Sequence, residues 1–145
     1  MTPQAGGQLT ESLLHEFAGC TATECPDGLA PFGGLVFDAV GNLYGTTTLG
    51  GAASTVCDQG STFKVGCGVV FKLTPDPNGA WEYSIVYRFP GDANGGYPTD
   101  DHVAVDLSGN IFGTTFVEGD VNNNSICPQE VFGLGGCGVV FELTP

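Results

Sequence analysis

The amino-acid sequence predicts an all-β chain made of two tandem, four-stranded antiparallel repeats. The main evidence is that Gly66–Pro75 returns as Gly136–Pro145, with nine of ten residues identical and an offset of 70 positions (136 − 66). Asp38–Thr47 likewise matches Asp106–Thr115. Helix is disfavoured because 24 glycines and 9 prolines interrupt nearly every window long enough for two helical turns. Repetition determines the architecture of a chain, although it does not reveal chemistry.

The two repeats are expected to form one structural domain, with repeat 1 at 1–74 and repeat 2 at 75–145. A weaker match supports this division, since Ser12–Phe17 resembles Ser84–Phe89 at an offset of 72 (84 − 12). A Thr-Pro pair lies at the boundary between the repeats, at 74–75, and recurs at 144–145. We therefore expect either a piece of a longer array or copies that join head to tail.

Alternating apolar residues place the strands. The first-repeat strands are expected at Leu9–Phe17, Leu35–Asp38, Leu43–Thr47 and Gly68–Thr74, and the second repeat then opens with Trp81–Phe89. Three sets of residues are each expected to share one face of a strand: Leu13, His15 and Phe17; Val69, Phe71 and Leu73; Trp81, Tyr83, Ile85, Tyr87 and Phe89. The second repeat should follow the same order, with a strand at Val103–Val105.

A hairpin turn containing Gly-Asn follows Asp38 and, in the second copy, Asp106. Such a turn needs a positive φ, which glycine adopts without strain. The preceding aspartate is expected to accept hydrogen bonds from the turn amides. This structural role is favoured over a catalytic or metal-binding role for either carboxylate.

The six cysteines are expected to form three local disulfides: Cys20–Cys25, Cys57–Cys67 and Cys127–Cys137. Six cysteines allow 15 pairings. The second and third pairs recur with the repeat at a spacing of ten (67 − 57 and 137 − 127), and the first pair lies in an insertion of its own. A zinc site is less favoured, because no CxxC pair occurs and both histidines, His15 and His102, lie outside the cysteine loops. Three disulfides would indicate an oxidising compartment.

The composition restricts the class of partner. Lys and Arg number 3 against 16 Asp and Glu, so the formal charge is −13, and this surface should repel nucleic acid and anionic membranes. No apolar run approaches the roughly 20 residues of a membrane span. No signal peptide is visible in this numbering, so a secreted protein would have lost it earlier.

These motifs resemble the GloVer tandem repeat of secreted bacterial proteins. The resemblance rests on Gly41–Thr47 followed by Gly66–Pro75 and on the second copy of both. It implies export and a β-propeller-like architecture, in which each four-stranded repeat is a blade, and it transfers no catalytic residue. Two blades cannot close a ring, because propellers need about four to eight. We therefore expect oligomerisation to complete the fold, with the last strand of one copy pairing with the first strand of another.

Candidate ligand sites are few. Asp120, Asn122 and Asn124 resemble the start of a calcium loop, although Ser125 replaces its glycine and no glutamate stands at the twelfth position; an ordinary turn is the favoured alternative. Asn123 begins a formal N-glycosylation sequon. Aromatic side chains alternating along one strand could stack on a sugar, although core packing is the more common role of such a pattern. They are Trp81, Tyr83 and Tyr87.

The sequence is compatible with three functions. The first is a secreted, non-enzymatic structural or adhesive protein without a cofactor, which assembles with itself into a ring or filament by strand pairing between chains. The second is a propeller that binds carbohydrate or, through calcium, another ligand, with the loops 50–66 and 118–136 as its binding face. The third is a lactonase-like or hydrolytic propeller enzyme. No G-x-S-x-G elbow occurs, and cysteines committed to disulfides cannot act as nucleophiles, so the first is favoured.

Overall fold

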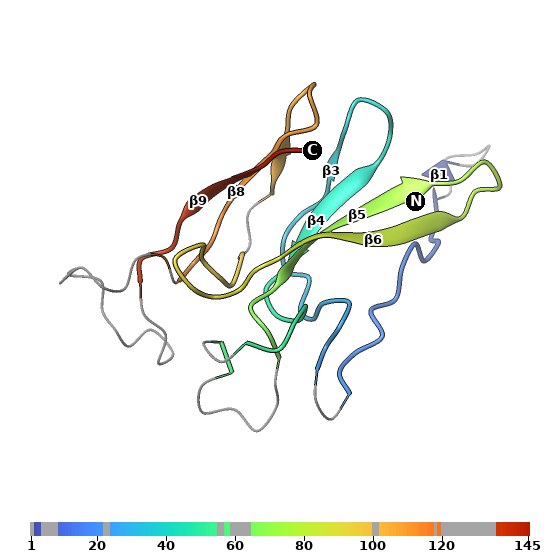
Figure 1. Ribbon diagram of the computed structural model, residues 1–145. Helices are drawn as coiled ribbons and strands as arrows, with labels where there is room; N and C mark the ends of the chain where they lie inside the picture. The colour runs from blue at the N-terminus through green and yellow to red at the C-terminus, as the bar shows by residue number, and fades with distance from the viewer. Residues whose placement is uncertain are drawn as a thin grey trace.

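The computed structural model describes residues 2–3, 9–21, 24–54, 57–58, 65–99, 102–117, 119 and 136–145. Within them the secondary structure is entirely β and lies in three antiparallel sheets. A two-stranded sheet pairs β1 (Thr2–Pro3) with β2 (Leu9–Thr10). The other two sheets are larger and lie side by side, as Figure 1 shows.

The larger two sheets, here called the first and the second sheet, repeat one topology. The first sheet has the order β3 (Val36–Phe37), β4 (Leu43–Thr47), β5 (Val69–Pro75) and β6 (Trp81–Arg88). The second sheet has the order β7 (Ala104–Val105), β8 (Ile111–Thr114) and β9 (Val140–Leu143). Each strand therefore pairs with its neighbour in sequence, as expected for a meander. A propeller-like arrangement beyond these sheets remains a prediction.

The four strands predicted for repeat 2 are present as β6, β7, β8 and β9, but β6 pairs in the first sheet, so the described residues of the second sheet form three strands. The sequence counterpart of β6 one repeat earlier is the segment 9–17, of which only Leu9–Thr10 is a strand. The predicted strand over Leu9–Phe17 is therefore too long, and Leu13 is 77% exposed. A segment forms a strand only where another backbone pairs with it, and residues 11–17 contact the first sheet through side chains without pairing with any strand of the described residues.

A β-bulge corrects the predicted face of β6. Phe71 pairs with Ile85, but the preceding Val70 pairs with Tyr87, so one residue of β6 is extra. An extra residue shifts every later side chain to the opposite face of the strand. Trp81, Tyr83 and Ile85 therefore pack on one face with Phe71, and Tyr87 and Phe89 pack on the other. The shared face of Val69, Phe71 and Leu73 is confirmed.

The main core joins the two sheets. Buried side chains of the first sheet and of the segment after it, Tyr44, Val70 and Phe89, pack with Val103 and Ile111 of the second. We call this contact the internal junction. Phe89 and Phe141 meet there edge to face, with ring centroids 5.2 Å apart. The first sheet therefore carries an apolar core on each of its faces, one of them at the internal junction.

The hairpin turns follow the predicted geometry. The Asp38 carboxylate accepts hydrogen bonds from the amides of Val40 (3.0 Å) and Asn42 (2.8 Å), and Gly41 has a φ of 93°. In the second copy the Asp106 carboxylate accepts the amide of Asn110 at 2.9 Å. A positive φ disfavours other residues, so glycine is required at the third position after Asp38.

Candidate functional site

Two predicted disulfides are present in the structure. Cys20 is bonded to Cys25 and Cys57 to Cys67. Cys137 is also disulfide-bonded, and its predicted partner, Cys127, lies outside the described residues. Cys67 is fully buried, and a Cβ on Gly91 would collide with both sulfurs of its disulfide. These bonds indicate an oxidising, extracellular-type environment.

The predicted aromatic platform is divided between two clusters. Trp81 and Tyr83 pack with Phe71, whereas Tyr87 packs at the internal junction. The Tyr83 hydroxyl donates a hydrogen bond to the carbonyl of Asp27, and burial together with the Asp27 charge raises its pKa. A sugar would need the three rings on one open surface, so the structure brings together only the first two.

The segment 11–20 is held to the first sheet around Tyr83. The His15 imidazole stacks on the Tyr83 ring with centroids 3.9 Å apart, and its Nε2 lies 3.6 Å from Oδ2 of Asp27. The same Asp27 oxygen accepts the amide of Ala18 at 2.7 Å. His15 therefore fills an aromatic packing position, as its alignment with Tyr87 predicts.

The segment also reproduces a contact of the internal junction. Phe17 meets Phe71 edge to face at 5.5 Å, as Phe89 meets Phe141 at 5.2 Å. Phe17 and Phe89 are 72 positions apart (89 − 17), and Phe71 and Phe141 are 70 apart (141 − 71), so both pairs follow the repeat. Phe17 therefore contacts the first sheet in the same way as Phe89, which directly follows β6, contacts the second sheet.

The backbone register of the two-stranded sheet agrees with this equivalence. Thr2 pairs with Thr10 and Pro3 with Leu9. The same pairs occur 72 positions later, where Thr74 faces Glu82 and Pro75 faces Trp81. The N-terminal residues therefore resemble the end of a third strand and the start of a fourth. The three-stranded second sheet lacks this fourth element among the described residues.

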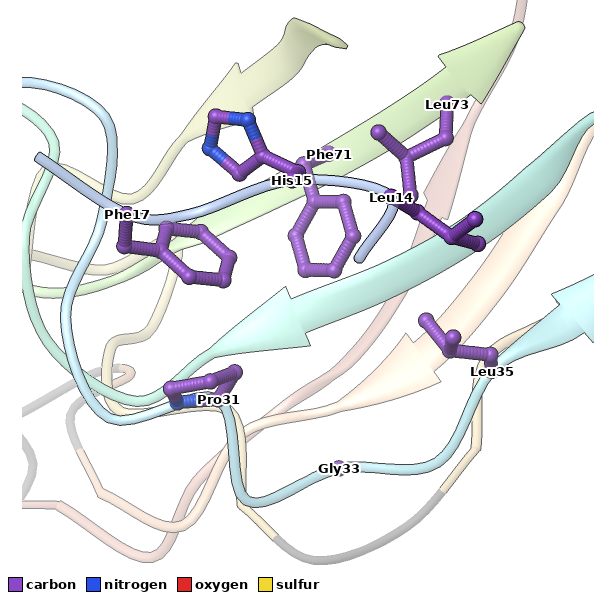
Figure 2. A pocket seen from close by; sticks show the side chains of 8 residues that line it. All are labelled: Leu14, His15, Phe17, Pro31, Gly33, Leu35, Phe71 and Leu73. Atoms are coloured by element: carbon purple, nitrogen blue, oxygen red, sulfur yellow. The ribbon is translucent and has the colours of Figure 1, made fainter. Parts of the chain in front are cut away.

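An apolar groove of about 270 Å³ lies between this segment and the first sheet (Figure 2). Its lining comes from three parts of the chain and is almost entirely apolar: Leu14, His15, Phe17, Pro31, Gly33, Leu35, Phe71 and Leu73. Figure 2 shows the rings of Phe17 and Phe71 and the side chain of Leu14 on one side of the groove, opposite Pro31 and Leu35. The His15 imidazole turns away from it.

The Asp38 and Asp106 carboxylates accept hydrogen bonds within their own hairpin turns. Burial raises the pKa of Asp38, but hydrogen bonds from Asn42, Val40 and Tyr44 outweigh this effect, and the pKa lies below its ordinary value. The backbone and side-chain hydrogen bonds of Asn110 likewise lower the pKa of Asp106. Both groups therefore stay ionised as hydrogen-bond acceptors and are not poised for proton transfer near neutral pH.

The remaining candidates lie outside the described residues. They are Asp120, Asn122 and Asn124 of the predicted calcium loop and Asn123 of the sequon. Within the described part of the chain, no group of three His, Cys, Asp or Glu residues could hold a metal ion. His15 stacks on Tyr83, whereas His102 is exposed and lies against Gly34.

No family model, curated protein or solved structure matches this chain. Among the residues that the structure describes, no helix is long and apolar enough to cross a membrane.

Sequence reasoning missed the exposed apolar residues of the second sheet. Val140 is 83% exposed and Phe112 is 36% exposed, whereas their repeat counterparts Val70 and Tyr44 are only 0% and 8% exposed. The repeat makes these pairs visible in the sequence. It does not reveal that one member of each pair is covered by the next sheet and the other is left open.

Proposed function

We propose that this chain is a secreted, non-enzymatic β-repeat protein whose structural or adhesive role depends on head-to-tail assembly. Residues 12–17 of one copy would pair with β9 of another, so that the second sheet gains its fourth strand. The observation that carries the proposal is the equivalence of this segment with β6 in its aromatic contact and in the register of its first residues.

The proposed pairing uses groups that the described structure leaves without a strand partner. β9 pairs with β8 along one edge, and the described residues provide no strand along the other. The backbone edge of 12–17 is separate from the side chains that pack on the first sheet, so one segment can serve both contacts. Unpaired strand edges readily recruit another chain.

The first sheet predicts the register of this pairing. Lys72 faces Ser84 and Val70 faces Tyr87 in the β5–β6 ladder. Their repeat counterparts place Glu142 opposite Ser12 and Val140 opposite His15. The new ladder would therefore run along β9 from Val140 to Glu142.

The chemistry of the chain also supports this function over catalysis. The described cysteines are disulfide-bonded, and the Asp38 and Asp106 carboxylates are committed to turns. Local disulfides suit a protein exported to an oxidising compartment. The charge of −13 opposes association at low ionic strength, so assembly should strengthen as salt screens it.

The test is the mass and shape of the non-reduced protein at about 0.15 M ionic strength, by light scattering and negative-stain microscopy. Rings or fibres would support the proposal, and a monomer at every accessible concentration would refute it. The register is tested by oxidising the double variant Ser12→Cys, Glu142→Cys, which should give a covalent ladder on a non-reducing gel. Ser12→Cys with Val140→Cys is the out-of-register control and should cross-link much less.

A further inference from the structure

The internal junction shows how the second sheet covers the first. Tyr44 and Val70 of the first sheet are 8% and 0% exposed, because they pack with Phe89, Val103 and Ile111 at the junction. Phe141 and Leu143 of β9 pack against the same cluster. One face of the first sheet thus fits the opposite face of the second. The two faces differ, so this is a head-to-tail contact.

The far face of the second sheet carries apolar side chains at the equivalent positions. No other sheet of the described structure covers them. Phe112 aligns with Tyr44, and Val140 aligns with Val70. Phe112 is 36% exposed and Val140 is 83% exposed. Phe112 and Val140 lie diagonally across β8 and β9, on the same face as Thr114 and Glu142. We call these two residues the open face.

The groove on the first sheet is lined by the repeat counterparts of residues that pack at the internal junction. Its residues Phe17, Leu35, Phe71 and Leu73 align with Phe89, Val103, Phe141 and Leu143, which pack around Tyr44 and Val70. Leu35 is 48% exposed, whereas its counterpart Val103 is 4% exposed. The lining of the groove therefore corresponds to that of the internal junction (Figure 2). What the groove lacks are counterparts of Tyr44 and Val70, the two side chains that fill the junction.

We propose that the groove receives Phe112 and Val140 of a second copy of this chain. This inference rests on the proposed head-to-tail assembly and names the side chains that would hold the copies together. The argument is continuity with the internal junction, since the same pair of faces already fits within one chain. The contact is heterologous, so each copy keeps one groove and one open face for further copies.

The test uses two variants that each disable one end. Val140→Asp charges the open face, and Leu35→Asp charges the groove. Burying an unpaired carboxylate in an apolar contact is costly, so each variant should associate at least about tenfold more weakly than the wild type. Both positions are exposed in the single chain, so both variants should keep the melting temperature that the wild type shows at dilutions where it is monomeric. Leu107→Asp is the matched control, because Leu107 is 94% exposed and its repeat counterpart Ala39 is exposed as well.

Mixing the two variants gives the deciding result. The Val140→Asp protein retains an intact groove, and the Leu35→Asp protein retains an intact open face. An equimolar mixture should therefore form a discrete 1:1 complex, while each variant alone stays monomeric. Assembly of Val140→Asp as strong as that of wild type would overturn this inference and leave strand pairing standing. A wild type that stays monomeric at every accessible concentration would overturn the proposed function as well.

Discussion

Gly45 is the position where the structure makes its sharpest prediction about stability. It lies in β4 opposite Phe71, and a Cβ added there would lie 2.6 Å from Cζ of Phe71 and 2.7 Å from Cδ2 of Leu35. Carbon atoms in contact normally lie about 3.5–4.0 Å apart, so one of these groups would have to move by about 1 Å. Leu35 is 48% exposed and can turn outward, but Phe71 is 4% exposed and enclosed.

The expected cost of Gly45→Ala follows from two opposing terms. Overpacking a core typically costs about 1–3 kcal/mol. Alanine is favoured over glycine within a strand by roughly 0.5–1 kcal/mol, because glycine loses more backbone entropy on folding. These two terms leave a net loss in the free energy of unfolding of about 0–2.5 kcal/mol, or a fall in Tm of up to about 10 °C for a chain of this size.

A double-mutant cycle separates the collision from other effects. The free energy of unfolding would be measured in urea, without reductant, for wild type, Gly45→Ala, Phe71→Leu and the double variant. Leucine at 71 lacks the Cζ atom that collides with the new Cβ. Gly45→Ala should therefore be neutral or stabilising by up to about 1 kcal/mol in the Phe71→Leu background, which gives a coupling energy of about 1–3 kcal/mol.

Gly41→Ala is the control for this cycle. Gly41 has a φ of 93° and nothing within 4 Å of an added Cβ, so its substitution causes backbone strain without a collision. Its cost should be the same with Phe71 or Leu at position 71. An equal cost of Gly45→Ala in the two backgrounds would refute the packing argument.

Two further predictions concern the turns and the disulfides. Because the pKa of Asp38 is lowered in the folded chain, its charge stabilises the fold above the ordinary value of 3.8, and this contribution is lost as the pH falls through the folded pKa. Asp38→Asn should therefore flatten the acid limb of a plot of Tm against pH, and an unchanged slope below about pH 4 would contradict the assignment. Replacing Cys57 and Cys67 together by alanine should cost about 2–3 kcal/mol by the chain-entropy estimate, and the shorter Cys20–Cys25 loop about half a kcal/mol less. Urea unfolding of both double variants measures the two losses in the free energy of unfolding. A larger loss on removing Cys20–Cys25 than on removing Cys57–Cys67 would contradict the prediction.

The local features of this protein could be predicted from its sequence. The Asp38 turn depends on hydrogen bonds between residues no more than six positions apart, together with one glycine of positive φ. The Cys20–Cys25 and Cys57–Cys67 bonds close loops between residues five and ten positions apart. Such contacts form within one segment, so the spacing of the residues is enough to indicate them.

The face that each side chain occupies could not be predicted in the same way. Strict alternation along Trp81–Phe89 placed Tyr87 with Tyr83, but the bulge opposite Val70 and Phe71 moves it to the internal junction. A bulge depends on how two strands fit against each other and leaves no clear sign in either strand alone. The predicted sugar-binding platform was divided for this reason.

The sequence by itself therefore determined the all-β class, the two copies of each motif, the hairpin turns and the local cysteine pairs. Only the tertiary structure decided which copies are covered and which are open. Val70 and Val140 lie in nearly identical stretches, yet one is fully buried and the other is 83% exposed. The physical reason is that burial depends on the neighbouring sheet, and a repeat specifies the shape of each surface without specifying what lies against it.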